Sequence, residues 1–352
     1  MNNNLKLVVF SNAEMLGKKV DEALRTLNNS SDTYIVPITS DRFSNGEGKV
    51  KINETVRDKD LYILSDVGNY SISYDFHNMK HYMSPDEHFQ DIKRLISATS
   101  GHAAKINVIM PMLYQSRQHK RKGRESLDCA LALQELERIG VTNIITFDAH
   151  DPNVVNAVPN LSFDNFYPTN IIIDALEKNE NINSDIIVVS PDMGAMERAR
   201  YFAGMLGCDV GLFYKRRDLT KVVNGKNPIV EHVYLGSDVK NKNILIVDDM
   251  ISSGTSMIET AKSLKEKGAK KIYLAATFAL FTEGIDMFDE AYNNKEFDKL
   301  YVTNLSYVSD DIKNKEWYNE TDCSGLIAEI INKLNKKESI AEIYEQGRNR
   351  LN

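Results

Sequence analysis

Short apolar runs alternate along the chain with longer segments whose apolar residues recur at helical spacing. The runs predict strands at residues 5–10, 33–38, 61–65, 104–110, 143–147, 186–190, 210–213, 244–247, 271–277 and 299–303. The longer segments predict helices at residues 13–27, 87–98, 127–139, 192–207, 257–267, 325–334 and 339–344. Continuous apolar runs of this length are typical of strands buried on both faces of a parallel sheet. The pattern therefore predicts an α/β protein in which mostly parallel sheets are flanked by helices.

Three segments between these elements follow other patterns. In residues 42–54, apolar residues alternate with lysines after a Ser-Asn-Gly turn, which predicts a half-exposed hairpin strand. Residues 69–85 have no clean periodicity, and we interpret them as a surface loop. The spacing of His77 and His81 suits metal binding on a helix, but without a third ligand a solvated face is favoured. Residues 221–228 predict a flexible loop of the kind that closes over an active site.

The stretch NILIVDDMISSGTS at residues 243–256 combines several parts of a ligand site. An apolar strand leads to two adjacent carboxylates, Asp248 and Asp249, and then to Ser, Gly and Thr residues that open the next helix. Hydroxyls and backbone N–H groups at a helix N-terminus favour an anion such as a phosphate. The paired acids can accept hydrogen bonds from hydroxyls or hold a divalent metal. One ligand with both a diol and a phosphate would fit the whole stretch.

Short motifs of this kind also occur by chance, and an acid at a strand end can simply cap the next helix. Two further predicted strands, however, end in the same way, one in Asp148, His150 and Asp151 and the other in Asp192 and Gly194. Ligands of open parallel sheets bind beyond the carboxyl ends of the strands. Three acidic strand ends therefore predict one catalytic edge, or two related ones. His150 is left open between a structural role and a role as metal ligand or proton donor.

Two clusters of basic residues stand out in a chain that is acidic overall. Residues 114–125 contain several Lys and Arg residues, in a segment that is either a solvated loop or a place where a polyphosphate is drawn in. Lys215, Arg216 and Arg217 follow a predicted strand almost directly. Cations at a strand end suit the stabilisation of an anionic transition state.

Composition narrows the class of protein. The chain has 352 residues, 42% hydrophobic and 26% charged, which is ordinary for a globular protein large enough for two domains. Its formal net charge of −7 argues against sequence-independent binding of nucleic acid. The three cysteines lie far apart, which argues against a zinc site or a disulfide framework. Without a signal-peptide pattern or an apolar run of transmembrane length, we expect a cytoplasmic protein with no membrane association.

Taken in order, the motifs resemble those of the ribose-phosphate diphosphokinase family, also called phosphoribosyl-diphosphate (PRPP) synthetases. The resemblance covers nearly the whole chain. It rests on Phe-Ser-Asn-Gly-Glu at 43–47, Ser-Arg-Gln at 116–118, the strand end with Asp148 and His150, Ser-Pro-Asp-Met-Gly at 190–194, Lys-Arg-Arg at 215–217 and Asp-Asp at 248–249. Phosphoribosyltransferases share the last motif but lack the purine hairpin and the Lys-Arg-Arg motif.

The resemblance implies an activity and a site. The family transfers the diphosphoryl group of ATP to the C1 hydroxyl of ribose 5-phosphate, giving PRPP and AMP, with Mg²⁺ as cofactor. It implies ATP binding by Phe43 (stacked on adenine), Asn45, Glu47, Arg117 and Gln118, and metal binding by His150 and Asp192. It implies ribose 5-phosphate binding by Asp248, Asp249, Ser253, Gly254, Thr255 and Ser256, and catalysis by Lys215 and Arg217.

The resemblance also implies an architecture with two phosphoribosyltransferase-like domains. Residues 1–165 would carry the ATP hairpin and the basic loop, and residues 166–310 the ribose-phosphate site. Residues 311–352 would form a tail that packs back on the N-terminal domain. The assembly implied is a homo-oligomer, from dimer to hexamer, in which a neighbouring subunit completes the ATP site.

The chain departs from the family pattern at several positions. The family has an acid where this chain has Asn45 and another where it has His119, and its phosphate turn reads Asp-Thr-Gly-Gly-Thr in place of the Ser-Ser-Gly-Thr-Ser sequence at 252–256. Residues 69–85 are an insertion by this comparison. Two alternatives therefore stay open beside the active enzyme: a non-catalytic regulatory partner of an active synthetase, and a phosphoribosyltransferase that consumes PRPP.

Overall fold

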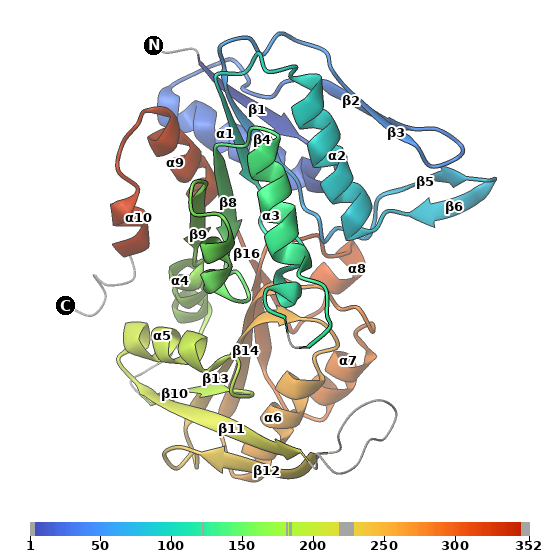
Figure 1. Cartoon of the computed structure of the whole chain (residues 1–352). Coiled ribbons are helices and arrows are strands. Elements are labelled where there is room, and N and C mark those ends of the chain that lie inside the picture. The colour runs from blue at the N-terminus through green and yellow to red at the C-terminus, as the bar shows by residue number, and fades with distance from the viewer. Residues whose placement is uncertain (1–3, 122, 181, 183–184, 218–228, 346–352) are drawn as a thin grey trace. The chain divides into compact units, whose positions relative to one another are not determined.

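Figure 1 presents the computed structural model of the chain, which describes residues 4–121, 123–180, 182, 185–217 and 229–345. The described chain forms two compact units that interleave in sequence. Unit 1 comprises Met1–Pro168, Asn304–Tyr307 and Asp322–Tyr344, and unit 2 comprises Thr169–Thr303, Val308–Thr321 and Glu345–Asn352. Each unit contains a mostly parallel sheet flanked by helices, so the predicted α/β fold class is confirmed.

The sheet of unit 1 is parallel throughout its described strands, in the spatial order β1-β4-β7-β8-β9. These strands are β1 (Leu5–Val9), β4 (Asp60–Leu64), β7 (Lys105–Ile109), β8 (Asn143–Phe147) and β9 (Ser162–Phe166). The helices between them are η1 (Ser11–Ala13), α1 (Glu14–Asn28), α2 (Pro85–Ala98), η2 (Ser116–Gln118), α3 (Asp128–Arg138) and η3 (Pro152–Ala157). Strand residues such as Leu61 and Val108 are buried with Ile92 of α2 and Leu133 of α3 in one apolar cluster.

The C-terminal helices α9 (Ser324–Asn335) and α10 (Ala341–Glu345) contribute to unit 1, and α9 packs against α1 (Figure 1). Asp322 precedes α9 and accepts a hydrogen bond from the Ser324 N–H at 2.9 Å, which satisfies a free donor of the first turn. Its other carboxylate oxygen pairs with Lys19 of α1 at 2.8 Å. Further along, Tyr344 of α10 stacks on Phe166 of β9 with ring centroids 4.6 Å apart.

The sheet of unit 2 has the strand order β12-β11-β10-β13-β14-β15-β16. Its strands are β10 (Ile186–Ser190), β11 (Asp209–Arg217), β12 (Ile229–Leu235), β13 (Asn243–Ile251), β14 (Lys271–Ala279), β15 (Lys299–Thr303) and β16 (Tyr318–Thr321). Only the pairing of β11 with β12 is antiparallel among these described strands. The accompanying helices are α4 (Thr169–Asn179), α5 (Met196–Leu206), α6 (Thr255–Glu266), α7 (Asp286–Asn293) and α8 (Asp310–Lys313).

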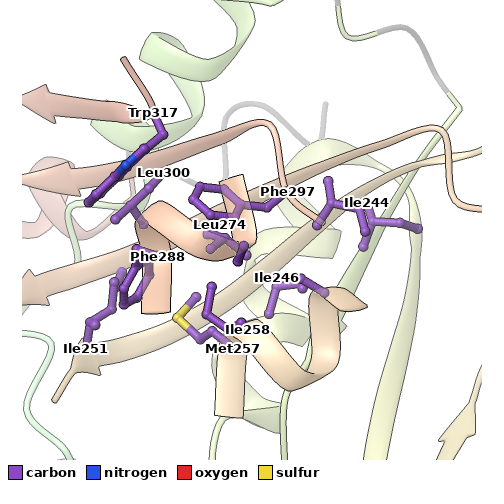
Figure 2. Packing of buried hydrophobic residues seen from close by; sticks show 14 of the residues in the cluster. Ile244, Ile246, Ile251, Met257, Ile258, Leu274, Phe288, Phe297, Leu300 and Trp317 are labelled. Atoms are coloured by element: carbon purple, nitrogen blue, oxygen red, sulfur yellow. The ribbon is translucent and has the colours of Figure 1, made fainter. Parts of the chain in front are cut away.

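Strand β13 lies within this sheet and is covered on both faces. Its alternate residues Ile244 and Ile246 join one apolar cluster, whereas Leu245 and Val247 join another. Figure 2 shows the first cluster, in which residues of β13, β14 and β15 face Met257 of α6 and aromatic side chains that include Phe288 and Trp317. This two-sided burial holds the strand that carries Asp248 and Asp249 in a fixed position.

Two sequence predictions about unit 1 are wrong. Residues 33–38 do not form a strand, because only Ile35 bridges to Leu7 and the following Pro37 has no N–H to extend the ladder. Residues 69–85 are not an irregular loop, since they contain the antiparallel hairpin β5 (Ser73–Phe76) and β6 (Met79–Tyr82). Its turn residues His77 and Asn78 both have positive φ, of 48° and 62°, which is the signature of a two-residue type I′ turn.

Strands β11 and β13 of unit 2 are longer than the apolar runs predict. Strand β13 continues through Asp248 and Asp249 to Ile251, because its pairing with β14 extends that far. Strand β11 likewise continues to Arg217, because β12 pairs with it. The acidic pair and the three cations therefore lie within the final part of each strand rather than beyond its end. The predicted flexible loop at 221–228 lies outside the described residues.

Candidate active site

The predicted base-binding residues lie on a hairpin of unit 1. Strands β2 (Ile38–Arg42) and β3 (Gly48–Ile52) pair in an antiparallel, two-stranded sheet, which confirms the predicted hairpin (Figure 1). In the turn between them, the Phe43 N–H donates to the Glu47 carbonyl and the Gly46 N–H donates to the Phe43 carbonyl, each at 2.8 Å. Gly46 has a φ of +88°, which favours glycine. Phe43 is 55% exposed, which is unusual for a large apolar side chain and leaves its ring free for stacking.

Asn45 and Glu47 are bonded to each other in the same turn. Asn45 Oδ1 accepts from the Glu47 N–H at 3.2 Å, and Asn45 Nδ2 donates to Glu47 Oε2 at 3.0 Å. These two bonds fix the orientation of the Asn45 amide, with its NH₂ group directed at a carboxylate. An aspartate at this position would repel Glu47, so the amide removes a like-charge contact from the turn.

The second pair of predicted ATP residues, Arg117 and Gln118, is exposed on the short helix η2. The following residue, His119, has its Nδ1 3.0 Å from the Ser116 carbonyl oxygen. Its Nε2 lies 3.1 Å from Asp151 Oδ2, within ion-pair distance but outside hydrogen-bonding geometry. The His119 and His150 rings are 5.5 Å apart. The structure therefore brings η2 and the strand end with His150 together.

That strand end, after β8, has a strained backbone. Asp148 is buried and adopts a φ of +42°, which is uncommon for a residue other than glycine. Asp151 Oδ1 accepts from Asn153 and caps η3. Burial raises the pKa of Asp151, but hydrogen bonds from Asn153 and the charges of His119 and Lys120 outweigh burial. The pKa of Asp151 is therefore below its ordinary value. Asp151 therefore has a structural role beside the exposed His150.

Helix α2 supports both groups of predicted ATP residues. Beside the turn of the β2–β3 hairpin, Arg42 forms a buried ion pair with Asp91 of α2, with side chains 6% and 5% exposed. Near η2, Tyr114 donates to Asp86 of α2 at 2.8 Å and stacks on Phe89 with centroids 4.2 Å apart. Residues separated by about seventy positions in sequence thus share one rigid support.

In unit 2, Asp248 and Asp249 form an acidic pair of adjacent residues. Asp248 Oδ1 accepts from the Asp249 N–H at 2.9 Å, and Asp249 Oδ1 accepts from the Met250 N–H at 2.9 Å. Burial, followed by the charge of Asp249, raises the pKa of Asp248 well above its ordinary value. Arg198 of α5, whose Nη1 is 4.0 Å from Asp248 Oδ1, opposes this rise. A ligand that donates hydrogen bonds would relieve the repulsion between the two carboxylates.

The turn after β13 leads into helix α6 through Gly254, which has a φ of +80°. A Cβ at this position would lie 2.3 Å from Cε2 of Phe288 on α7, so only glycine fits. Ser253 Oγ and Thr255 Oγ1 are 3.0 Å apart. The turn thus presents hydroxyls and backbone N–H groups at the N-terminus of a helix, where the helix dipole favours an anion.

Ser252 lies at the position where the resemblance implies an acid, and its hydroxyl and carbonyl both have partners in the structure. Ser252 Oγ lies 2.9 Å from Thr282 Oγ1, and the Thr282 N–H donates to the Ser252 carbonyl at 3.0 Å. These bonds tie the turn to the segment after β14. The substitution therefore keeps the turn anchored without a charge.

Asp192 lies in the loop that follows β10, the strand beside β13. Its Oδ1 accepts from the N–H groups of Gly194 at 2.8 Å and Ala195 at 3.2 Å, which closes the turn before α5. The pairing of β13 with β10 ends at Ile246, before the acidic pair. On the β10 side, Asp248 and Asp249 therefore lie beyond this strand pairing, and the loop after β10 follows there instead. The same loop and helix bring Arg198 to Asp248, a contact that acidic strand ends alone do not predict.

Lys215 and Arg217 lie on β11, and their backbone pairs with His232 and Ile229 of β12, with an irregularity between Arg216 and Arg217. Their side chains lie outside the described part of the structure. Their proposed catalytic roles therefore stay predictions from sequence and charge.

The predicted metal ligands His150 and Asp192 belong to different units. Across the described residues, no three His, Cys, Asp or Glu side chains gather into a group that could hold a metal ion. Magnesium prefers oxygen ligands and is often bound by one or two carboxylates together with substrate phosphates. The carboxylates of Asp192 and the acidic pair fit that chemistry, whereas the His150 nitrogen suits it less well.

Comparison with known proteins identifies both halves of the chain. The N-terminal domain of ribose phosphate pyrophosphokinase matches residues 5–140, and the phosphoribosyl transferase domain matches residues 165–304. A ribose-phosphate pyrophosphokinase of Chlorobaculum tepidum is 28% identical over 347 residues, covering 98% of this chain and 96% of the relative. One of Mycoplasma genitalium is 29% identical over 355 residues, covering 97% and 96%.

A solved structure shares the fold. The crystal structure of phosphoribosylpyrophosphate synthetase from Mycobacterium smegmatis matches with a TM-score of 0.77 at 22% identity, covering 95% of this chain and 100% of that one. The fold and the acidic pair with its phosphate-type turn define an α/β protein of the phosphoribosyltransferase-like class. With its matching N-terminal domain, the chain belongs to the ribose-phosphate pyrophosphokinase family, another name for the ribose-phosphate diphosphokinases.

Proposed function

We propose that this protein is an active ribose-phosphate diphosphokinase, which transfers the diphosphoryl group of ATP to the C1 hydroxyl of ribose 5-phosphate. The observation that carries this proposal is the presence of two different recognition elements in one chain. Unit 1 has a hairpin with an exposed aromatic ring, Phe43, and unit 2 has the acidic pair that precedes a phosphate-type turn. A protein that only consumes PRPP would have no use for the first element.

Unit 1 is proposed to bind ATP. Phe43 stacks on the adenine ring, and the oxygens of Asn45 and Glu47 accept hydrogen bonds from the amino group of the base. Arg117 and Gln118, exposed on η2, contact the rest of the nucleotide. Their shared support on α2 keeps both groups in place without the nucleotide, which limits the entropy lost on binding.

Unit 2 is proposed to bind ribose 5-phosphate. Asp248 and Asp249 accept hydrogen bonds from the 2- and 3-hydroxyls, and the turn from Ser253 to Ser256 binds the 5-phosphate. The hydroxyl donors favour the ionised form of Asp248, whose pKa burial and Asp249 otherwise raise. The ligand thus relieves an unfavourable contact between the two carboxylates.

The reaction is a substitution at the β-phosphorus of ATP. The C1 oxygen forms a bond to this phosphorus, the bond to the α-phosphate oxygen breaks, and AMP leaves while the hydroxyl proton passes to solvent. Such a transfer depends mainly on positioning and on neutralisation of charge. Lys215 and Arg217 are proposed to stabilise the charge on the transferred group.

Magnesium is the cofactor we infer from family membership. His150 and Asp192 are proposed to hold it together with the phosphates, where it would neutralise part of their charge.

We further infer a homo-oligomer, between dimer and hexamer. In the described residues, no helix combines the length and the apolar composition needed to cross a membrane.

The proposal is tested by incubating the purified protein with ATP, Mg²⁺ and ribose 5-phosphate and following AMP and PRPP by chromatography. We expect equal amounts of both products, formed only when ribose 5-phosphate is present. Absence of product from a folded protein that binds ATP would contradict the proposal and favour a regulatory partner of an active synthetase. Consumption of PRPP with a nucleobase, without AMP formation from ATP, would instead indicate a phosphoribosyltransferase.

A further inference from the structure

The β2–β3 hairpin needs support that its own strands do not supply. It is a two-stranded sheet, and isolated hairpins of this size are marginally stable in water. Beside its turn, the hairpin is anchored through the buried ion pair of Arg42, the last residue of β2, with Asp91 of α2. The turn itself, residues 43–47, lies between Arg42 and Gly48 and carries the three residues proposed to bind the base.

A second hairpin contacts this turn. The His77 N–H, in the turn between β5 and β6, donates to the Ser44 carbonyl at 3.2 Å. A Cβ on Gly46 would lie 3.1 Å from Cε2 of Phe76 and 3.4 Å from the hydroxyl oxygen of Tyr74, so both side chains pack directly on the glycine backbone. Figure 1 shows the β5–β6 hairpin beside the end of β2 and β3.

The contacts leave the proposed ligand-binding side chains open. They fall on Ser44 and Gly46, the two turn residues with no proposed role toward ATP. Phe43, Asn45 and Glu47, which alternate with these two residues, remain exposed. The β5–β6 hairpin thus holds the backbone of the turn without covering the residues proposed to meet the base.

The β5–β6 hairpin is in turn fixed to helix α2. Tyr74 donates from its hydroxyl to Glu87 Oε1 at 2.7 Å, and His81 Nε2 lies 2.9 Å from Glu87 Oε2. Glu87 itself forms the capping box of α2 with Ser84. A continuous set of contacts therefore runs from the first turn of α2 through Tyr74 and Phe76 to Gly46.

We propose that the β5–β6 hairpin is a positioning element for ATP, which holds the turn at residues 43–47 in its nucleotide-binding conformation. Phe76 and Tyr74 are its positioning residues. The proposal rests on the proposed function in assigning this turn to ATP. Its physical basis is that a turn ordered before binding loses less conformational entropy when the nucleotide arrives.

The backbone at the two ends of the β5–β6 hairpin allows the hairpin to be replaced by a short turn. The Met83 N–H donates to the Ile72 carbonyl at 2.8 Å, which is the bond that closes a four-residue turn. Residues 73–82 can therefore be replaced by Asn-Gly between Ile72 and Met83. A second variant, Phe76→Ala, removes only the ring against Gly46. Met79→Ala is the matched control, since Met79 lies opposite Phe76 on the same hairpin and is 65% exposed.

Equilibrium binding of ATP and amide hydrogen exchange are measured for these variants and for Phe76→Leu. We expect both the replacement and Phe76→Ala to weaken ATP binding about tenfold. The Phe43 and Gly46 amides should exchange faster, while exchange in β4 and α2 is retained as evidence of folding. In turnover, KM for ATP should rise with kcat and KM for ribose 5-phosphate unchanged. Phe76→Leu should restore most of the affinity, and Met79→Ala should behave as wild type.

Several outcomes would overturn the proposal. One is unchanged ATP affinity and unchanged exchange at Phe43 and Gly46 in the replacement variant. Another is a loss of ATP affinity that accompanies a smaller assembly in light scattering, because the hairpin would then act through subunit contacts. A wild-type protein that binds ATP but forms no PRPP would contradict the proposed function alone, since binding and exchange need no turnover. Failure of the wild-type protein to bind ATP would contradict both.

Discussion

At the scale of single residues, the exposed ring of Phe43 is the part of the ATP site most open to test. Stacking of a base on an aromatic side chain contributes about 1–3 kcal/mol. We expect Phe43→Ala to raise KM for ATP roughly tenfold, by the usual conversion of about 1.4 kcal/mol per decade. Steady-state kinetics with varied ATP measure this, with KM for ribose 5-phosphate unchanged.

Tyr82→Ala is the control for Phe43→Ala, because Tyr82 on β6 is also aromatic and equally exposed, at 55%. It should leave both KM values unchanged. If Phe43→Ala left the KM for ATP unaffected, or if Tyr82→Ala raised it equally, Phe43 would not be the stacking residue.

Substitution of Gly254 tests the proposed phosphate-binding turn, and Gly284 provides a control within the same protein. Gly254→Ala adds backbone strain of about 1–2 kcal/mol at its positive φ, together with an overlap with Phe288 of about 1–3 kcal/mol. Gly284 has nearly the same φ, +81°, but nothing lies within 4 Å of the position that a Cβ would take there. We expect Gly254→Ala to lower the melting temperature more than Gly284→Ala, and only Gly254→Ala to raise KM for ribose 5-phosphate. Equal effects of both substitutions would contradict this account of the turn.

Lys215 carries the proposed stabilisation of the transition state. Removing one such group typically lowers kcat about 10²–10³-fold. We expect Lys215→Ala to do so while the thermal unfolding of the protein stays the same. Arg200→Ala, which removes a largely exposed cation of the same unit, should leave kcat unchanged. Normal turnover by Lys215→Ala would rule out this role.

At the scale of elements, the contact of α9 with α1 depends on an ionised carboxylate. Burial raises the pKa of Asp322, but hydrogen bonds from Lys19, Ser324 and Asn304 outweigh it and lower the pKa to about 2. The folded state therefore keeps Asp322 ionised at a pH where the unfolded chain binds a proton. This stabilisation is complete above about pH 4 and is lost as the pH falls toward 2.

Since Asp322 is half-exposed, its contribution is modest, about 1 kcal/mol or less. We expect the difference in melting temperature between wild type and Asp322→Asn to be constant from neutral pH down to about pH 5 and to shrink below about pH 4. Differential scanning calorimetry across this range measures it. A difference that stays the same at low pH would show that Asp322 is not ionised to the extent described.

The elements also show what sequence patterns can and cannot predict. Strand β15 has the predicted bounds, because its apolar run is buried throughout. The β5–β6 hairpin escapes prediction because its turn uses His77 and Asn78 at positive φ, where the pattern looks for glycine. The ends of β11 and β13 escape it because charged residues extend both strands, and only the neighbouring strand reveals such pairing.

Other parts of unit 2 have no usable signal. Strand β12 follows residues whose pattern indicates a loop, and the short strand β16 and helix α8 lack a periodic apolar stretch of sufficient length. In the sequence, Arg198 is simply part of a predicted helix. Its approach to Asp248 comes from the adjacency of β10 and β13, a tertiary feature that no local pattern encodes.

At the scale of the whole molecule, the order of motifs is more informative than any single motif. The fold class, the family and the activity of the relatives all agree with the prediction from that order. The roles of the individual site residues stay predictions, because those roles depend on bound ATP, ribose 5-phosphate and Mg²⁺ and on the charged side chains around them. Ser252 is one example, since its hydroxyl lies 2.9 Å from Thr282 Oγ1 but brings no charge to the turn.

Transfer of label from ATP tests the central claim most directly. The protein is incubated with ATP that carries ³²P at the β-phosphorus, together with Mg²⁺ and ribose 5-phosphate, and the products are separated by chromatography. We predict that the label appears in PRPP and that the AMP formed in equal amount is unlabelled, because the diphosphoryl group moves as one piece. Label retained in ADP, or ATP left unchanged by a folded protein that binds both substrates, would contradict the account.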